Sequence, residues 1–530
     1  MRKLFYNGTI LTMDQDKPQA AAVAVEGDRI AEVYEEVPAD WNEEKIDLCG
    51  RTLLPGFIDG HSHFVACANG LSQCDLSEAH NFQDIVSLMK RFLEEQKIPK
   101  GKWVVGTNYD HNFLEEKCHP DRYLLDEISK EHPILVIHVS SHMGVSNSLG
   151  LQEQKLDDSV ENPQGGRYGR FQEDGSLNGY MEENAFMDFR KSCASFDLEV
   201  MKKNIEKAQQ LYAGYGITMI QDGMVGESLY HLLKMFAEQG LLKMDVVGYV
   251  DLENCRDLYR EHLKEHSYQN HFRLGGYKIF LDGSPQGRTA WMKEPYEGSD
   301  DCGYPVHSDD ELYRLITEAL EDGAQLLAHC NGDAAAEQYV AQFTKVMEEH
   351  PDQQTNRPVM IHAQLVREEE LKKMKKLEMI PSFFVAHTYY WGDIHLQNFG
   401  KARAERISPV QDAIQAGLRY TFHQDTPVLP PDMMKTIGCA VNRVTREGVL
   451  LAKEQRVTVQ EALEAVTIHA AYQYGEEADK GSIEAGKKAN FVILEQNPLS
   501  VPVGELEKIK VFQTIADGEI IFCRETGSSV

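Results

Sequence analysis

The chain has 530 residues, of which 42% are hydrophobic and 26% charged, as in globular proteins large enough for a barrel and an accessory domain. Its 84 acidic and 54 basic residues give a formal net charge of −30, which disfavours binding to nucleic acid and to anionic membranes. The N-terminal residues lack the apolar stretch of a signal peptide, no run could span a membrane, and the ten cysteines form no CxxC pair, so we expect a cytoplasmic protein with reduced thiols.

Strand-like runs separated by short turns occupy both ends of the chain, residues 1–53 and residues 476–530. The turns contain Asn7-Gly8, Gly27-Asp28 and Asp517-Gly518, which are typical of tight hairpins. Neither end has enough apolar surface for a core of its own. We therefore expect the two ends to pair into one small composite β-sandwich domain, with residues 54–475 inserted between them.

Short apolar runs alternate with amphipathic helical patterns between the two ends. One such helix is predicted over Asp309–Glu321, with Gly323 as its stop signal. This alternation is typical of a parallel sheet, so the predicted fold class is α/β. Eight such strands are the number that closes a (β/α)8 barrel of the TIM type. The eight predicted strands are Phe57–His63, Ile217–Gln221, Val246–Val250, Lys278–Leu281, Leu326–His329, Val359–His362, Ile380–Phe384 and Tyr420–His423.

Residues 64–210 do not fit this count of strands. They hold an amphipathic helix that begins near Phe82 and two strand-like runs, Trp103–Gly106 and Ile134–Val139. We expect a large insertion after the first barrel strand, and we expect it to cover the substrate site because the loops of the catalytic face begin there. An alternative count would place the two strand-like runs in the barrel itself.

Two histidines one residue apart, His61 and His63, follow the first apolar run. Side chains at positions i and i+2 of a strand point to the same side, so both imidazoles could face one metal ion. Active sites of such barrels lie at the carboxyl ends of the strands. A single histidine there is usually structural, but several potential ligands together favour a metal centre. The potential ligands at these ends are His61, His63, Lys278, His329, His362 and Asp425.

Several motifs resemble those of the amidohydrolase superfamily, and within it the amidohydrolase-3 group of YtcJ-like metal-dependent hydrolases. The resemblance covers nearly the whole chain. The family usually has Asp where this chain has Asn490, a residue of the terminal β domain without a catalytic role. The motifs that carry the resemblance are residues 55–63 (PGFIDGHSH), 278–283 (KIFLDG), 328–333 (AHCNGD), 361–363 (IHA), 423–428 (HQDTPV) and 481–491 (GSIEAGKKANF).

The resemblance implies a site with two divalent metal ions, one held by His61, His63 and Asp425 and the other by His329 and His362. Lys278 would bridge the ions as a carbamate formed with CO2, which requires a buried, neutral amine. The alternatives are a buried lysine paired with a carboxylate, a different bridging residue, or a single firmly bound ion. Zinc is the expected metal, and iron, manganese and cobalt are alternatives.

The implied reaction is attack on a polarised carbonyl by a metal-activated hydroxide. Asp425 would be the catalytic residue, because it lies next to the hydroxide and can transfer its proton to the leaving nitrogen.

Five further residues are candidates for contact with the substrate. Asp110 and His142 lie in segments that resemble the pocket lining of the YtcJ-like group, and Glu183 matches a glutamate of relatives. Arg288 could bind an anionic group through two parallel hydrogen bonds. His387 lies just after the seventh predicted strand. The alternative for each is structural: a hydrogen bond that stabilises a loop, a solvated helix position, a salt bridge, or packing of a lid.

The predicted protein is a metal-dependent hydrolase acting on a non-peptide carbon–nitrogen bond of a small molecule, such as an N-acyl, N-formyl or cyclic amide. An esterase or lactonase on the same metal site, a metal-dependent isomerase or decarboxylase, and a non-catalytic binding protein are the alternatives. The expected partner is a small-molecule substrate, without nucleic acid or membrane, and a homodimer is the expectation from the family.

Overall fold

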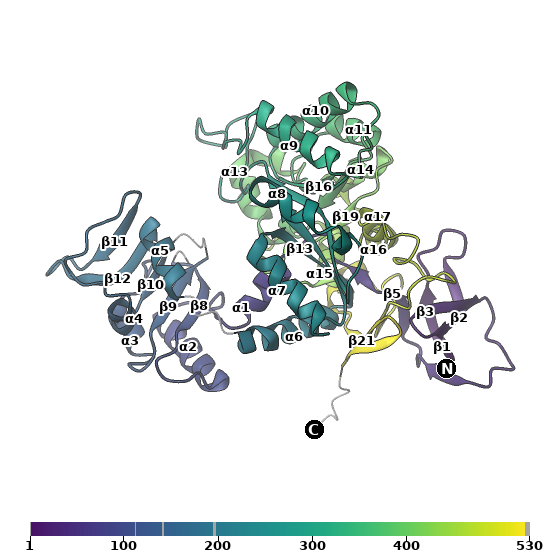
Figure 1. Ribbon diagram of the computed structural model, residues 1–530, viewed down its shortest axis with the longest axis horizontal. Coiled ribbons are helices and arrows are strands. Elements are labelled where there is room, and N and C mark those ends of the chain that lie inside the picture. The colour runs from purple at the N-terminus through teal and green to yellow at the C-terminus, as the bar shows by residue number, and fades with distance from the viewer. Residues whose placement is uncertain (1, 112, 140–142, 194–197, 525–530) are drawn as a thin grey trace. The chain divides into compact units, whose positions relative to one another are not determined.

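A computed structural model describes residues 2–111, 113–139, 143–193 and 198–524 of the chain. The chain divides into two compact units, which are described separately (Figure 1). Unit 1 comprises Met1–Cys67 and Glu206–Val530, and unit 2 comprises Ala68–Ile205. Among the described residues, every helix is too short or too polar to cross a membrane.

Strands from both ends of the chain form one sheet of unit 1. Figure 1 shows purple strands from the start of the chain and a yellow strand from its end in this part of the unit. The strand order is β22-β21-β20-β5-β1-β2-β3, and β4 pairs with β1. The bounds are β1 Arg2–Leu11, β2 Gln19–Glu26, β3 Arg29–Tyr34, β4 Glu44–Asp47, β5 Thr52–Pro55, β20 Phe491–Leu494, β21 Val511–Ala516 and β22 Glu519–Cys523.

A bulge in β1 explains why these strands share a single sheet in place of the two sheets expected of a sandwich. The predicted hairpin at Asn7-Gly8 is wrong, because β1 runs through it with a register shift between Tyr6 and Ile10. Asn7 adopts a φ of 57°, and a Cβ on Gly8 would lie 2.4 Å from the carbonyl oxygen of Arg51. The first half of β1 therefore pairs with β4 and the second half with β5.

The two other predicted hairpins are present. Gly27-Asp28 joins β2 to β3, with Glu26 opposite Arg29. Asp517-Gly518 joins β21 to β22.

Eight parallel strands form the second sheet of unit 1, in the order β19-β18-β17-β16-β15-β14-β13-β6. The segments that follow the two outer strands also meet, because the backbone N–H of His63 donates to the carbonyl of Thr426 at 2.8 Å. The sheet thus closes on itself as in a (β/α)8 barrel. The bounds are β6 Phe57–Ile58, β13 Ile217–Val225, β14 Asp245–Asp251, β15 Phe272–Phe280, β16 Gln325–Cys330, β17 Val359–His362, β18 Ile380–Phe383 and β19 Thr421–Phe422.

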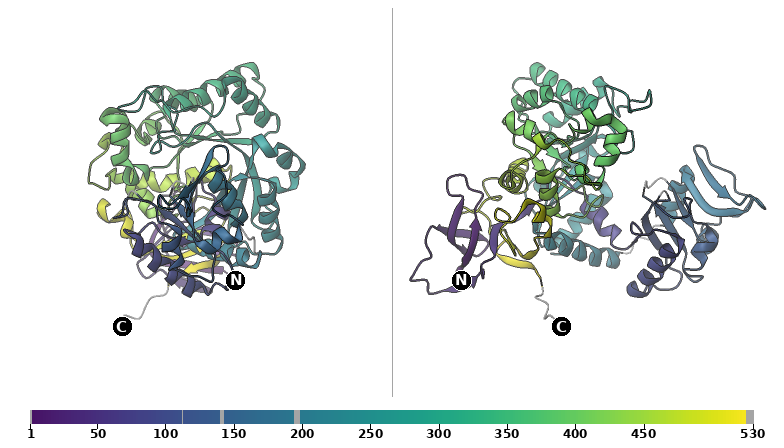
Figure 2. Two further views of the ribbon diagram at one scale, coloured as in Figure 1. Left: turned by 90° about the vertical axis from the view of Figure 1, so that its left-hand side faces the viewer. Right: turned by 180° about the vertical axis from the view of Figure 1, so that it is seen from behind.

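Helices follow these strands and surround the sheet (Figure 2). Helix α9 shows why they form where they do: Ser308 and Glu311 make a reciprocal capping box at its start, and Gly323, with a φ of 63°, follows its end. The principal helices are α6 Leu198–Gly214, α7 Glu227–Glu238, α8 Leu252–Glu261, α9 Asp309–Glu321, α10 Asp333–Glu349, α11 Glu368–Lys376, α12 His387–Tyr390, α13 Gly392–Ala404, α14 Val410–Gln415, α15 Met433–Asn442, α16 Val459–Ala465 and α17 Ile468–Gln473.

The first barrel strand is shorter than predicted. It ends at Ile58, so His61 and His63 lie in the segment that follows and not in the strand itself. A local turn replaces the ladder, since the carboxylate of Asp59 accepts the backbone N–H of His61 at 3.3 Å. The alternation of side chains along a strand therefore does not explain why the two histidines face the same point.

Unit 2 contains its own sheet, with strand order β11-β12-β10-β9-β8-β7. The predicted runs Trp103–Gly106 and Ile134–Val139 fall in β8 and β9, so the alternative that placed them in the barrel is wrong. The elements of this unit are α2 Phe82–Gln96, α3 Arg122–Asp126, α4 Ser148–Glu153, α5 Asn184–Cys193, β7 Cys74–Asp75, β8 Val104–Tyr109, β9 Ile134–His138, β10 Met143–Ser146, β11 Gly166–Arg170 and β12 Leu177–Glu183.

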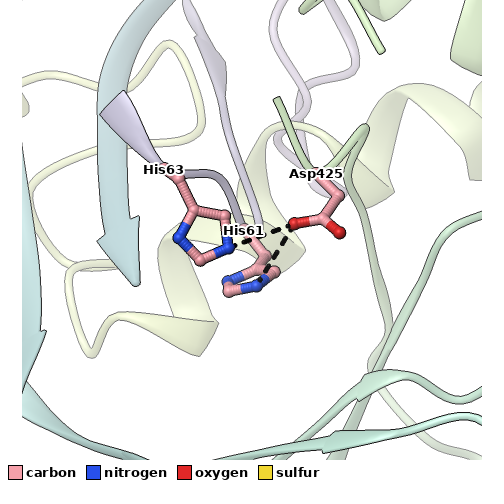
Figure 3. Close-up of side chains that lie close together, drawn as sticks. All are labelled: His61, His63 and Asp425. Carbon is pink, nitrogen blue, oxygen red and sulfur yellow. Dashed lines mark ion pairs between the residues drawn. The ribbon is translucent and has the colours of Figure 1, made fainter. Parts of the chain in front are cut away.

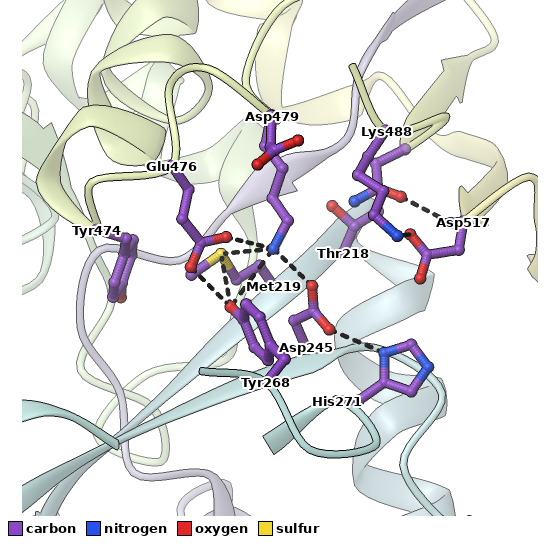
Figure 4. Close-up of polar contacts among 12 residues, drawn as sticks. Thr218, Met219, Asp245, Tyr268, His271, Tyr474, Glu476, Asp479, Lys488 and Asp517 are labelled. Atoms are coloured by element: carbon purple, nitrogen blue, oxygen red, sulfur yellow. Dashed lines mark hydrogen bonds and ion pairs between the residues drawn. The ribbon is translucent and has the colours of Figure 1, made fainter. Parts of the chain in front are cut away.

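A buried ion cluster ties the C-terminal part of unit 1 to its parallel sheet (Figure 4). The ammonium of Lys480, whose side chain is 4% exposed, lies 2.5 Å from a carboxylate oxygen of Asp245 and 2.5 Å from one of Glu476. Asp245 also accepts from His271 at 2.8 Å, and the hydroxyl of Tyr268 donates to Glu476 at 2.9 Å. Each buried charge therefore has an opposite charge or a hydrogen bond beside it.

Replacing Lys480 with Met should destabilise the protein by about 3–5 kcal/mol, because the buried carboxylate of Asp245 would lose its ammonium partner and Glu476 would keep only Arg273. The matched control is Lys508→Met, which removes an exposed pair with Glu505 and should cost less than about 1 kcal/mol. Urea denaturation of the three proteins measures both values. Equal stabilities for the two variants would contradict the importance of the cluster.

Candidate metal centre

Three side chains that follow the first and the last strand of the parallel sheet meet at one point (Figure 3). Oδ1 of Asp425 lies 3.6 Å from Nε2 of His61 and 3.4 Å from Nε2 of His63. Ligands of a tetrahedral zinc ion at bond lengths of about 2.0–2.2 Å lie about 3.3–3.6 Å apart. The same Oδ1 atom is buried and accepts no hydrogen bond from the described residues, which fits an atom that binds a cation. The three residues therefore suit one metal ion.

Strand β13 fixes the orientation of both imidazoles. Nδ1 of His61 lies 2.5 Å from Oε1 of Gln221, and Nδ1 of His63 lies 2.9 Å from the carbonyl oxygen of Gly223. Gln221 is itself oriented, since its Nε2 donates to the carbonyl of Gly60. Because these oxygens can only accept, each Nδ1 carries a hydrogen, and in the neutral ring each Nε2 presents its lone pair to Asp425.

Three further histidines form a hydrogen-bonded row beside this point. Nε2 of His362 lies 3.0 Å from Nδ1 of His329, and Nδ1 of His362 lies 3.1 Å from Nε2 of His423. The row ends where Nδ1 of His423 meets the hydroxyl of Ser382 at 2.9 Å. Burial lowers the pKa of His329 to about 4 and that of His423 to about 3. The rings are thus neutral at physiological pH, as metal ligands must be.

His423 is a member of this row that the candidate list from the sequence lacks. It closes the eighth predicted strand and precedes Gln424 and Asp425 in a quoted motif. The signal that would have found it is the one that found His329 and His362, a histidine at the carboxyl end of a barrel strand.

Lys278 lies near the end of β15 with its side chain fully buried. Its Nζ atom is 3.4 Å from Nε2 of His61, and among the described residues it forms no ion pair with a carboxylate. Burial lowers the pKa of this amine to about 7, although the charge of Asp425 partly opposes the shift. A substantial fraction of the lysine is therefore uncharged near neutral pH.

Backbone conformation also holds two of these residues in place. His362 has a φ of 73° and Asp425 a φ of 56°, both in the left-handed region that side chains other than glycine rarely adopt. Such conformations persist where the surrounding structure determines them, and they are concentrated at functional sites.

Asp282 is a buried carboxylate that braces the loops around the site, a role the sequence did not reveal. It accepts backbone N–H groups from Trp291 at 3.0 Å, Asn331 at 2.9 Å and Gly332 at 2.7 Å. The loops that follow β15 and β16, the strands of Lys278 and His329, are thereby joined. Burial raises the pKa of Asp282 to about 7 despite these three donors.

The five predicted substrate contacts are scattered. Asp110 and Glu183 belong to unit 2, and His142 lies outside the described residues. Arg288 is exposed, and its Nε donates to Oδ1 of Asn398 at 2.9 Å, a contact of the loop-bracing kind considered as the alternative. His387, the first residue of α12, is buried beside Phe384 and His395. Its Nδ1 lies 3.1 Å from Nε2 of His395. A substrate role for any of the five stays a prediction.

Comparison with known proteins gives consistent matches along the chain. Residues 44–522 match the model of the amidohydrolase family. The N-substituted formamide deformylase of Arthrobacter pascens is 26% identical, over 99% of this chain and 99% of its own. The putative amidohydrolase YtcJ of Bacillus subtilis (strain 168) is 25% identical, over 98% of this chain and 99% of its own.

Solved structures share the fold. An uncharacterised metal-dependent hydrolase from Pyrococcus horikoshii OT3 superimposes with a TM-score of 0.78 at 24% identity, covering 95% of this chain and 99% of that chain.

Gln221→Met should weaken zinc binding by about 10–100-fold, because His61 would lose the acceptor that fixes its tautomer. Competition with a chromophoric chelator measures the affinity. Gln221→Glu retains an acceptor and should bind zinc nearly as well as the natural protein. Gln210→Met, at an exposed glutamine of α6, is the control for loss of an amide. Unchanged affinity in a folded Gln221→Met protein would contradict this role.

Proposed function

The chain belongs to the amidohydrolase family and is an enzyme, and on that premise we propose that it hydrolyses the carbon–nitrogen bond of an N-acyl, N-formyl or cyclic amide. The observation that carries the proposal is the buried Oδ1 atom of Asp425. It accepts no hydrogen bond from the described residues, and it faces Nε2 of His61 and Nε2 of His63. The N-substituted formamide deformylase, alignable over nearly its whole length, supports formamides as the first substrates to try.

The donor set suits two divalent ions, for which zinc is the proposed identity and iron, manganese and cobalt are the alternatives. His61, His63 and Asp425 would hold one ion. His329 and His362 would hold the other. Their facing nitrogens lie 3.0 Å apart, which is slightly less than the separation of about 3.3–3.6 Å expected between two ligands of a zinc ion. The exposed fraction of the side chains rises from 1% at His61 to 27% at His63, so a substrate would enter beside His63.

We propose that Lys278 bridges the two ions as a carbamate. Its neutral amine would add to CO2, forming a nitrogen–carbon bond and releasing one proton. The fully buried ammonium would otherwise stand beside two cations, whereas the carbamate offers two anionic oxygens. The lowered pKa of the amine supports the reaction, because only the uncharged form is nucleophilic.

The residues of the site then divide the reaction between them. A divalent ion bound there lowers the pKa of a water and polarises the substrate carbonyl. The carboxylate of Asp425 is ionised when it faces a cation, because a nearby opposite charge favours the charged form. The ionised Asp425 can therefore accept the proton of the attacking water and deliver it to the leaving nitrogen, which yields a carboxylic acid and an amine.

A panel of N-formyl and N-acyl amines, cyclic amides, esters and lactones tests the proposed reaction. We expect the zinc-loaded protein to release amine from at least one amide, and exhaustive chelation to abolish that release. Faster turnover of esters or lactones than of every amide would overturn the proposed bond class.

Asp425→Asn should retain the fold and part of the metal yet lose about 10²–10⁴-fold in turnover, because the amide cannot accept the proton. Single-turnover assays with the best substrate of the panel, alongside metal analysis, measure both properties. Full turnover of this variant would contradict the proposed proton transfer.

Lys278→Met should lose most of its turnover and the proposed carbamate. In the natural protein, equilibration with ¹³C-labelled CO2 should give a carbamate signal by NMR that the variant lacks. Removal of CO2 from the natural enzyme should lower activity, and bicarbonate should restore it. A fully active Lys278→Met protein would exclude the bridge.

A further inference from the structure

Unit 2 contains a second cluster of potential metal ligands, formed by residues 110, 111 and 138. Nδ1 of His111 lies 3.1 Å from Nε2 of His138. Oδ1 of Asp110 lies 3.5 Å from that Nε2 atom and 3.8 Å from that Nδ1 atom. These three distances, 3.1, 3.5 and 3.8 Å, lie close to the separation of about 3.3–3.6 Å expected between ligands of a tetrahedral zinc ion.

The strands of unit 2 bring these residues together. β8 and β9 are parallel neighbours, and Tyr109 at the end of β8 is the register partner of His138 at the end of β9. The backbone N–H of Val139 then donates to the carbonyl of Tyr109 at 2.9 Å. Because Asp110 and His111 follow directly, all three side chains leave the carboxyl ends of adjacent parallel strands.

Aromatic stacking supports the ring of His111. His119 packs on it with ring centroids 4.2 Å apart and planes tilted by 32°, and Tyr180 packs on His119 with centroids 4.6 Å apart. His119 is fixed in turn, since its Nδ1 lies 2.9 Å from the hydroxyl of Tyr109. This packing restricts the orientation of the His111 ring.

The cluster is also accessible to an ion from solution. The side chains of Asp110 and His111 are 21% and 28% exposed, while that of His138 is 7% exposed. We propose that Asp110, His111 and His138 of unit 2 bind a divalent cation of the zinc class. The ion joins the segment after β8 to the end of β9.

Two histidines and one carboxylate select zinc, cobalt or nickel over magnesium and calcium, which prefer sites made only of oxygen. The proposal does not depend on the reaction proposed above, because it concerns other residues. A role of Asp110 in substrate contact would change the Michaelis constant, whereas this proposal concerns the number of bound ions.

Metal analysis of the full chain tests the site. In a His61→Asn/His63→Asn/Asp425→Asn/His329→Asn/His362→Asn background, which removes the proposed histidine and aspartate ligands of both ions of unit 1, zinc-loaded protein should still hold the ion of unit 2. Adding His111→Gln and His138→Gln should remove one molar equivalent of zinc and the visible absorption of the cobalt-loaded form. His80→Gln, at an exposed histidine of the same unit, should remove neither.

An unchanged zinc content after His111→Gln and His138→Gln, in protein with a native circular dichroism spectrum, would overturn the proposal. Crystals of the natural protein give a test that does not depend on variants. Anomalous scattering at the zinc edge should show a peak bounded by the three side chains, and density without such a peak in zinc-soaked crystals would overturn the site.

Discussion

The inward orientation of imidazole lone pairs toward a buried carboxylate oxygen is the constraint on which the metal centre depends. A buried carboxylate oxygen without a hydrogen bond costs free energy unless a cation or a donor faces it. At Asp425 the Nδ1 hydrogens of His61 and His63 are committed to oxygens of β13, so in the neutral rings that bind a metal the nitrogens that face the carboxylate have no proton to donate. The arrangement is unfavourable by itself and becomes favourable when a cation is bound. Gln221 and Gly223 are for this reason as much a part of the centre as the side chains that touch the ion.

The sequence allowed the broad fold and the main ligand set to be predicted, because both depend on local patterns. Apolar runs between helical patterns located the eight parallel strands, and Gly323 marked the end of α9. Histidines and an aspartate at strand ends indicated the candidate ligands. These signals are carried by neighbours in the chain and need no knowledge of the tertiary structure.

Contacts between distant residues could not be predicted. Asn7-Gly8 has the composition of a hairpin, but the contact of Gly8 with Arg51 makes it a bulge. His61 and His63 face one point because Gln221 and Gly223 hold them, about 160 residues further along the chain, and not because they alternate along a strand. Asp282 lies in a quoted motif, but its bracing role could not be predicted, since its three partners are backbone N–H groups whose position depends on the completed barrel.

The pairing of β5 with β20 has a consequence for synthesis of the protein. Thr52 lies opposite Leu494, so β5 leaves the ribosome long before its partner has been translated. At about 5–20 residues per second the delay is roughly 20–90 s. During that interval the nascent chain carries an unpaired apolar strand edge of the kind that recruits other chains. Completion of the terminal sheet must therefore wait until the last residues of the chain have been synthesised.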